Sequence, residues 1–460
     1  MRRKVFSALM CAAMVTSLFA GCGSSGDSGD AKKDSSQASD DATVSDSSDD
    51  GKVLNIYCWN EEFKSRITDH YPDYKEVDAT HGKIGDVEVV WNITPSDDNA
   101  YQNNLDTTLL NQDDAQADDK IDLFLVEADN ALKYVDTDYT MPIKDLGITD
   151  EDLSKQYQYT KDIVTDSNGT LKGVSWQGCP GVLFYNREAA KEVLGSDDPD
   201  EVQKYVKDWD TFNDTAKKMK DAGYKMTSSA NDTYRVYSNN VTTKWVTDGK
   251  VSVDDNIMKW VDDSKKLVDA GETGTFDMWS DDWSKGFYPE GKVFCYFGPA
   301  WLVNFSMAAD TEGSIGHEGG WGAAQGPQGF FWGGTWICAA KGTDNAGLIK
   351  DIMLKMTTDE ATMKEIVVDD DDFVNNKDVM NKMAADTSYS SKILGGQNPL
   401  GMYCAGVESL DLSNLCSYDQ GCNEEFQKAM KNYFEGKATK EDALDLFYKG
   451  VEEKYPELSH

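Results

Sequence analysis

The chain has 460 residues, 39% of them hydrophobic and 11% aromatic, so it is long enough to bury the cores of two ordinary domains. Its 82 acidic residues outnumber its 45 basic residues and give a formal net charge of −37. This balance repels nucleic acid and anionic lipid headgroups, so binding to DNA or RNA is disfavoured.

The first residues have the pattern of an export signal. Arg2-Arg3-Lys4 precedes a largely apolar run from Val5 to Phe19, which is too short to span a bilayer comfortably. The run ends in Leu18-Phe19-Ala20-Gly21-Cys22, which resembles a bacterial lipobox, with Phe19 where the pattern usually has leucine. The resemblance implies a signal peptide over residues 1–21 and lipidation of Cys22. A plain secretory signal with a chance cysteine is the alternative.

The segment that follows consists mostly of Ser, Asp and Gly up to Lys52. Such a segment cannot bury enough apolar surface to offset its chain entropy, so disorder is predicted. Residues 22–52 would then tether a globular body to a membrane through the lipid on Cys22. We therefore expect the protein on the extracellular face of the cytoplasmic membrane of a bacterium, of the Gram-positive type.

Cysteine and histidine usage argues against a disulfide framework and against a metal site. Seven cysteines remain beyond Cys22, an odd number scattered through apolar surroundings, so free buried thiols are expected. Cys416 and Cys422 are the one pair close enough in sequence to suggest a bridge. The four histidines are isolated from ligand-spaced cysteines, and no metal or other cofactor is predicted.

The body begins with alternating strands and helices. Val53 to Trp59, Val87 to Ile93 and Ile121 to Val126 are short apolar runs of the strand type, and a polar helix is predicted around Tyr101 to Leu110. Asn168-Gly169 between β-prone flanks predicts a hairpin. Strands separated by helices indicate parallel βαβ units.

Helices dominate the later part of the chain. Apolar residues at three- and four-residue spacing predict a helix from Trp209 to Ala222, capped by Asp208 and stopped by Gly223. A second helix is predicted near Asn345 to Met356. A C-terminal helix pair follows, with Thr439 to Asp442 as a capping box before the last helix.

The order of these segments resembles the extracellular solute-binding proteins of carbohydrate ABC importers (family 1, the maltose-binding-protein-like group). The resemblance covers nearly the whole mature body, and each motif alone is weak. The motifs that carry it, in order, are Tyr57-Cys58-Trp59-Asn60-Glu61, Ile121 to Asp129, Asn168 to Val174, Leu183-Phe184-Tyr185-Asn186-Arg187, Asp208 to Phe212, Gly291 to Trp301 and Phe373 to Lys377. The insert from Glu76 to Asp86 has no clear counterpart, and the run Asp369 to Asp372 is interpreted as a solvated acidic turn.

The resemblance implies an α/β, two-lobed periplasmic-binding-protein-like fold of type II, with a ligand cleft between lobes joined by a hinge. The N-terminal lobe is expected to comprise residues 53–178 plus about 322–370. The C-terminal lobe is expected to comprise residues 179–321 plus about 371–460. One crossing between the lobes is predicted at Gln177 to Gly181.

A sugar site needs flat rings for the apolar faces of a pyranose and carboxylates or amides for its hydroxyls. Any one tryptophan is more often core than ligand contact, so position decides the candidates. Five rings are selected by position. Trp59 ends a strand, Trp176 lies beside the predicted crossing, Trp301 is at the family's aromatic position, and Trp332 and Trp336 lie among the glycines of residues 329–336.

Polar candidates follow from the same reasoning. Strand-end position selects Asn60, Glu61, Glu127 and Asp129, although a solvated surface charge is the default for each acid. The resemblance adds Asp232, Tyr234 and Arg235, where the family carries an acidic residue and a stacking tyrosine.

The function implied is capture of a carbohydrate, an oligosaccharide in preference to a monosaccharide, by hinge closure, with delivery to the transmembrane subunits of an ABC permease. A monomer without catalytic residues is expected. A cell-surface glycoside hydrolase is the rival from another class, since it too combines tryptophans with paired carboxylates. A binding protein for a non-sugar solute on the same fold is a further alternative.

Overall fold

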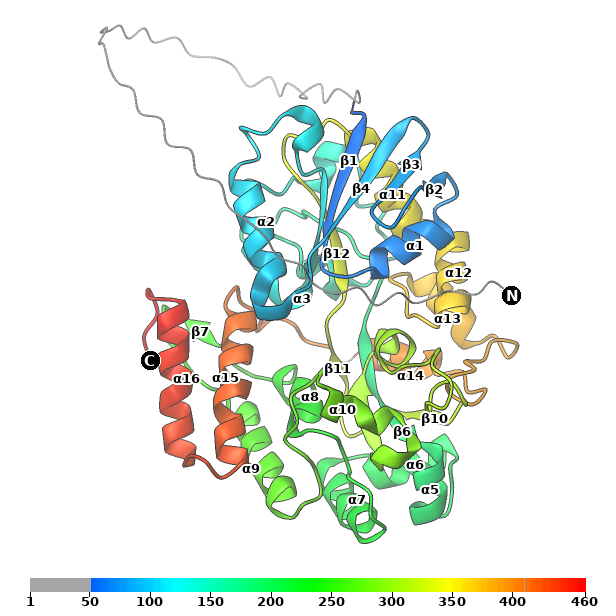
Figure 1. Ribbon diagram of the computed structural model, residues 1–460, viewed down its shortest axis with the longest axis vertical. Helices are drawn as coiled ribbons and strands as arrows, with labels where there is room; N and C mark the ends of the chain where they lie inside the picture. Colours follow the sequence, from blue (N-terminus) through cyan, green and yellow to red (C-terminus); the bar gives the residue numbers. More distant parts are fainter. Residues whose placement is uncertain (1–50, 409) are drawn as a thin grey trace, which may run out of the picture. The chain divides into compact units, whose positions relative to one another are not determined.

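The computed structural model describes residues 51–408 and 410–460 (Figure 1). The predicted signal peptide, Cys22 and the predicted tether up to residue 50 lie outside the described residues. Within the described ranges, no helix has both the length and the apolar character that crossing a membrane requires.

The first of two main sheets is built around parallel strands. Strand β1 (Val53–Cys58) lies between β4 (Val87–Ile93) and β5 (Leu123–Glu127) and is parallel to both, which confirms the predicted βαβ units. Strand β12 (Thr335–Ala339) returns from much later in the chain and adds to β5 in antiparallel sense (Figure 1). Since the carboxyl ends of β1 and β5 lie at one edge of the sheet, residues that follow these strands are brought together.

The segment without a family counterpart forms the far edge of this sheet. Strands β2 (Tyr74–Glu76) and β3 (His81–Ile84) make an antiparallel hairpin that continues from β4. Trp91 Nε1 donates a hydrogen bond of 2.9 Å to the Tyr74 hydroxyl and so ties the hairpin to β4.

Helices complete the first lobe, and the two predicted from the sequence here are confirmed within two residues at each end. Helix α11 packs against β12, α3 packs against β5, and α1 packs against α12. These helices are α1 (Glu62–His70), α2 (Ala100–Leu110), α3 (Ala128–Val135), α4 (Gln158–Asp162), α11 (Ala346–Thr358) and α12 (Glu360–Asp370).

The second sheet is antiparallel and is organised by one fully buried strand, β6 (Pro180–Asn186). Strands β9 (Cys295–Gly298), β10 (Trp321–Ala324) and β11 (Phe330–Phe331) all pair with β6. The chain therefore leaves the second sheet after β11 and re-enters the first sheet at β12. The lobe boundaries as a whole stay a prediction.

Two helices of the second lobe begin at the caps predicted from the sequence. Asp208 caps α7, where it also forms a capping box with Thr211, and Thr439 and Asp442 form the expected capping box at the start of α16. Gly223, with φ of +88°, follows α7 as the predicted stop. The helices are α5 (Arg187–Leu194), α6 (Pro199–Val206), α7 (Trp209–Asp221), α8 (Tyr234–Ser238), α9 (Asp255–Asp269), α10 (Asp281–Ser284), α13 (Lys377–Ala384), α14 (Leu400–Val407), α15 (Asp419–Phe434) and α16 (Lys440–Lys454).

Three segments that cross between the lobes are hydrogen-bonded to one another. Gly178 N donates to Phe373 O (3.0 Å), and Asn375 N donates to Trp176 O (2.7 Å). Trp332 N donates to Cys179 O (3.2 Å). The crossing predicted at Gln177 to Gly181 therefore lies beside two others, from residues 331–335 and 372–376.

The prediction of a solvated turn at Asp369 to Asp372 is confirmed for the exposed Asp369 and wrong for the three acids that follow. Asp370 accepts a 2.8 Å hydrogen bond from Arg66, and Asp372 is 2% exposed and accepts one from Gln177 Nε2 (3.1 Å). A run of four acids is typical of a surface, but Arg66, about 300 residues earlier in the chain, lies against Asp370 and Asp372 and offsets part of their charge.

Trp176 tests how far the first lobe depends on aromatic packing. It is fully buried and stacks on Phe63, with ring centroids 5.2 Å apart and an interplanar angle of 23°. Trp176→Ala leaves a large cavity and is expected to lower the free energy of unfolding by about 3–5 kcal/mol. Urea denaturation followed by circular dichroism measures this. Trp279→Ala is the control, because Trp279 is 55% exposed; equal losses in the two variants contradict the assignment of Trp176 to the core.

Candidate functional site

Both lobes line a cavity of about 640 Å3. The first lobe contributes to the cavity lining with residues at the ends of β1 and β5 and with the first turns of α1, α2 and α3. The second lobe contributes with α8, the loop before α10, the π-helical turn Leu302–Ser306 and α15. Residues 332–335, in the crossing between β11 and β12, form part of its wall.

Tryptophan rings make one wall of the cavity. Trp301 and Trp332 have centroids 5.1 Å apart, and Trp279 lies 5.8 Å from Trp332 and 6.3 Å from Trp301. Trp301 Nε1 donates to Trp332 O at 3.3 Å, which fixes the direction of the Trp301 ring. Trp59 stands on the first lobe against Tyr101, with centroids 5.6 Å apart. Rings of both lobes therefore face the same space.

Glycines allow the crossing to pass close to these rings, as the sequence predicted. A Cβ on Gly333 would lie 3.3 Å from the Trp301 ring and 3.5 Å from a Glu127 carboxylate oxygen. Gly333 and Gly334 also have φ values of +66° and +100°, in the region that side-chain-bearing residues avoid. The wall of the cavity therefore depends on glycine at these two positions.

Acidic and amide groups approach from the first lobe. Glu127 caps α3 by accepting the Asp129 N–H at 2.9 Å, and burial, with the neighbouring charge of Asp129, raises the pKa of Glu127 to about 8. Asn60 Oδ1 accepts the Glu62 N–H at 3.0 Å at the start of α1. Two buried oxygens of cavity-lining amides, Gln102 Oε1 and Asn130 Oδ1, have no hydrogen-bond partner among the described residues.

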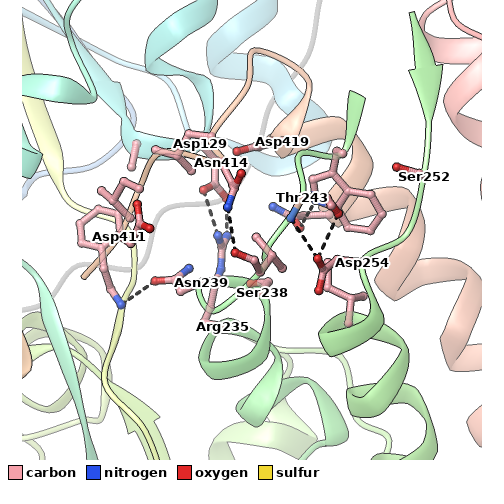
Figure 2. Close-up of a pocket in the computed structure, with 18 residues that line it drawn as sticks. Asp129, Arg235, Ser238, Asn239, Thr243, Ser252, Asp254, Asp411, Asn414 and Asp419 are labelled. Atoms are coloured by element: carbon pink, nitrogen blue, oxygen red, sulfur yellow. Dashed lines mark hydrogen bonds and ion pairs between the residues drawn. The ribbon is translucent and has the colours of Figure 1, made fainter. Parts of the chain in front are cut away.

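An ion pair spans the two lobes at the cavity. Arg235 on α8 donates to both carboxylate oxygens of Asp129 on α3, one at 2.9 Å. Figure 2 shows this pair from a small side pocket of about 40 Å3 that shares Asp129, Arg235 and Asn423 with the main cavity. In the same view Asp254 accepts hydrogen bonds from Thr243, which fixes the loop behind Arg235.

Seven of the twelve predicted ligand-binding residues line the cavity. They are Trp59, Asn60, Glu127, Asp129, Arg235, Trp301 and Trp332. Their role in binding stays a prediction. Strand ends predicted four of them and the glycine-rich segment predicted Trp332, whereas the family resemblance predicted Trp301 and Arg235.

Trp176 and Trp336 lie in the core of the first lobe instead. Both are fully buried, and Trp336 Nε1 donates to Thr160 O at 2.7 Å. Their neighbours in the sequence turn toward the cavity, but alternation along the extended chain turns these two rings the other way.

The remaining three candidates also lie outside the cavity lining. Glu61 is exposed before α1. Asp232 is buried and accepts from Trp283 Nε1 (2.7 Å), and Tyr234 donates to Asn423 Oδ1 (2.6 Å). Tyr234 therefore supports Asn423, which lines the cavity, without lining it itself.

Sequence reasoning missed two groups of cavity residues. Trp279 and Phe305 are 55% and 50% exposed at the rim, and an aromatic ring set among polar residues was the available signal for Trp279. The other group lies on α15, where the polar residues Gln420, Asn423, Glu424 and Gln427 recur at helical spacing opposite the apolar stripe of the same helix.

Neither a disulfide nor a cluster of metal ligands occurs among the described residues. All seven cysteines of these ranges are free thiols, Cys416 and Cys422 included. Residues 51–408 and 410–460 hold no group of three or more His, Cys, Asp or Glu side chains arranged to bind a metal ion.

Comparison with known families identifies the chain. The family of bacterial extracellular solute-binding proteins matches residues 73–387. The chain belongs to this family. No curated protein matched the sequence in a separate comparison.

Solved structures share the fold of this solute-binding protein. A crystal structure of an extracellular solute-binding protein of family 1 has a TM-score of 0.70 and 18% identity, covering 87% of this chain and 99% of that chain. The Bifidobacterium animalis subsp. lactis binding protein in complex with β-1,6-galactobiose has a TM-score of 0.67 and 17% identity, covering 89% and 100%. The Bifidobacterium longum galacto-N-biose-/lacto-N-biose I-binding protein has a TM-score of 0.64 and 13% identity, covering 90% and 100%.

These likenesses confirm the predicted α/β, two-lobed periplasmic-binding-protein fold. The family and the fold are those of substrate-binding proteins and not of enzymes.

The buried carboxyl of Asp232 gives a prediction for the pH dependence of stability. Burial raises the pKa of Asp232 from 3.8 to about 7. Between about pH 4 and pH 7, the Asp232 carboxyl is therefore protonated in the folded protein and ionised in the unfolded chain. The stability from this proton is fully present below pH 4 and is lost as the pH rises through 7.

We expect the free energy of unfolding to fall more steeply between pH 5 and pH 8 in the wild type than in Asp232→Asn, whose amide does not titrate. Urea denaturation at each pH measures both proteins. Glu62, Glu127 and Asp419 have raised pKa values and remain in both proteins, so they cancel in the comparison. Parallel stability curves would contradict the assignment.

Proposed function

We propose that the protein is a lipid-anchored extracellular solute-binding protein that captures an oligosaccharide and delivers it to an ABC importer by closure of the two lobes. The observation that carries the proposal is the cavity itself, where the rings of Trp59, Trp279, Trp301 and Trp332 face carboxylate and amide groups. Rings cover the apolar faces of a sugar, while the polar groups bind its hydroxyls.

The size of the cavity and its unpartnered groups support a ligand of this kind. A volume of about 640 Å3 is in the range of small-molecule sites. Gln102 and Asn130 add amide side chains to its polar lining, and one buried oxygen of each lacks a partner among the described residues.

The ligands of structural neighbours support the choice of an oligosaccharide. The Listeria monocytogenes substrate-binding protein was solved with cycloalternan, and the Arthrobacter globiformis protein binds cyclic α-maltosyl-1,6-maltose. The two bifidobacterial proteins were solved with the disaccharides β-1,6-galactobiose and lacto-N-biose. The proposal transfers the class of ligand to this chain and leaves the individual sugar open.

A thermal-shift screen tests the proposal. The panel contains β-1,6-galactobiose, lacto-N-biose, maltose, cycloalternan and their longer homologues. A sugar at 100 times its dissociation constant is expected to add about 2.7 kcal/mol of stability. A panel without any shift contradicts the carbohydrate proposal, and release of reducing sugar from a panel member contradicts the proposal of a non-catalytic protein.

Trp301→Ala and Trp279→Ala are each expected to weaken binding of the sugar found in the screen by about tenfold or more, because each removes an aromatic surface of the cavity. Isothermal titration calorimetry measures the change. Phe276→Ala is the matched control, since Phe276 is a 45% exposed ring that does not line the cavity. Unchanged affinity in both tryptophan variants would remove these rings from the site.

The anchor, the permease partner and the monomeric state are further parts of the proposal. They rest on residues 1–52 and on the family. Cys22→Ala is expected to abolish metabolic labelling by a radiolabelled fatty acid, because it removes the thiol that would carry the lipid. Autoradiography of the protein from cells that express either the wild type or the variant measures this. Labelling that persists in Cys22→Ala contradicts lipidation at Cys22.

A further inference from the structure

The mouth of the cavity is marked by exposed side chains. Most of the described residues that line the cavity are buried or half-buried, including the rings of Trp301 and Trp332. Three lining residues are exposed: Ser96 from the loop before α2, and Trp279 and Phe305 of the second lobe. The cavity therefore opens to solvent beside these residues, and two of the three are aromatic.

Exposed aromatic rings gather near this mouth. Among the described residues, the exposed Phe and Trp side chains are Phe276, Trp279 and Phe305, each about half exposed. Single exposed apolar residues are common on soluble proteins, whereas a group of large ones marks an interaction surface. Since two of the three rings belong to the lining of one cavity, they indicate that the ligand space extends to its rim.

Trp279 connects the inner rings with the rim. Its ring centroid lies 5.8 Å from that of Trp332 and 6.3 Å from that of Trp301, with interplanar angles of 36° and 30°. The Trp279 ring is thus closer to parallel than to perpendicular with both, and it continues the aromatic wall outward. A ring surface of this kind that remains in water can cover the apolar face of one more pyranose.

The backbone holds Trp279 at the rim in a costly conformation. Its φ is +70°, a region that bulky side chains avoid. The turn is fixed on both sides, because the Ser280 N–H and hydroxyl donate to Asp277 O at 3.2 and 2.6 Å, and Asp277 pairs with Lys431 of α15 at 2.5 Å. Neither the backbone strain nor the exposure of the indole stabilises the fold, whereas a ligand at the rim would use the exposed ring.

We propose that Trp279 and Phe305 form an outer subsite over which a glycan chain leaves the cavity, so that the protein selects chains longer than a disaccharide, with one end in solvent. This inference rests on the proposed function and narrows its substrate class. The inner rings and the amides and carboxyl groups of the first lobe hold the enclosed units. The outer rings hold the next unit, and units beyond the rim make no further contact.

Calorimetry with a homologous series of chain lengths, built on a sugar that gives a shift in the thermal screen, tests the inference. Affinity is expected to rise by about tenfold or more from the disaccharide to the chain that covers the outer rings. It is then expected to stay level as more units are added in solvent. A disaccharide that binds as tightly as every longer member contradicts the outer subsite.

The proposal also requires the two ends of the chain to differ. One sample of a long chain carries a bulky fluorophore at the reducing end, and a second carries it at the other end. One label is expected to leave the affinity unchanged, because that end lies in solvent, and the other is expected to abolish binding. Equal effects of the two labels contradict an exit at the rim.

Variants of the exposed rings assign the gain in affinity to the rim. Trp279→Ala and Phe305→Ala are each expected to remove most of the gain between the disaccharide and the longer chain, and both should fold because the rings are exposed. Trp301→Ala, which removes an inner ring, is expected to weaken all chain lengths by a similar factor. Phe276→Ala is the matched control, an exposed ring outside the lining whose loss should change neither affinity.

Iodide quenching of fluorescence gives a readout that is independent of affinity. Trp279 is the exposed tryptophan among the described residues, so iodide reaches it in the free protein. A saturating long chain is expected to protect it, and a saturating disaccharide is not. The protection should disappear in Trp279→Phe. Long chains that bind without any change in quenching contradict contact with Trp279.

The outcomes separate this inference from the proposed function. A gain with chain length that is lost in the rim variants supports both. Glycans that bind with an affinity independent of length, or a gain that persists in both rim variants, overturn the outer subsite and leave the carbohydrate proposal intact. A series in which no glycan binds overturns the carbohydrate proposal, and the inference falls with it.

Discussion

The three segments that run between the lobes, already joined by backbone hydrogen bonds, also meet at one buried amide, that of Gln177. Its Nε2 donates to Glu62 (2.6 Å) and Asp372 (3.1 Å), and its Oε1 accepts the Thr335 N–H (3.2 Å). These partners come from α1 and from the other two crossings. An amide that is 1% exposed must satisfy its donors and acceptor internally, so its geometry fixes all three segments at one point. This point therefore contributes to the relative positions of the two lobes beside the cavity.

Gln177 in turn lies against a buried charge cluster. Arg66 pairs with Asp370 at 2.8 Å and lies 3.8 Å from both Glu62 and Asp372. Burial raises the pKa of Glu62 to about 7 and raises that of Asp372, with the Arg66 charge opposing both shifts. Such a network adds little net stability compared with apolar packing, but each member is costly to leave unpaired. The network therefore restricts the arrangement of the crossings more than it stabilises the fold. Glu62 belongs both to this cluster and to the lining of the cavity.

Much of the fold was predictable because its signals are local. The strands at residues 53–59 and 87–93, the helix after Asp208 and the capping box at Thr439 depend on hydrophobic period and cap chemistry within a few residues. Strand ends also placed Trp59 and Glu127 correctly at the cavity, because parallel strands deliver their carboxyl ends to one edge.

What the sequence could not predict depends on partners far along the chain. The interior position of Asp370 requires Arg66, and no local pattern connects them. Trp332 and Trp336 are four residues apart in one glycine-rich segment, yet only Trp332 lines the cavity, and Trp336 lies in the core. The positive φ values of Gly333 and Gly334 change the backbone direction between the two rings, so they point to different places. The polar residues of α15 recur at helical spacing in the sequence, but only the tertiary fold shows that this face lines the cavity.

The two lobes contribute different kinds of side chain to the cavity. The second lobe brings Trp279 and Trp301, whereas the first brings Glu127 and the amides of α2 and α3. Outside the crossings, contacts between the lobes include the Asp129–Arg235 pair and a 3.2 Å hydrogen bond from Gln420 Nε2 to Asn99 Oδ1. The ion pair of Lys382 on α13 with Glu360 on α12, at 2.9 Å, is a further contact of this kind. A sugar held between the rings and the acids completes contacts that neither lobe can make alone. Since one inter-lobe contact is the Asp129–Arg235 ion pair and both residues also line the cavity, a substitution of Arg235 changes the contact between the lobes and the cavity lining together.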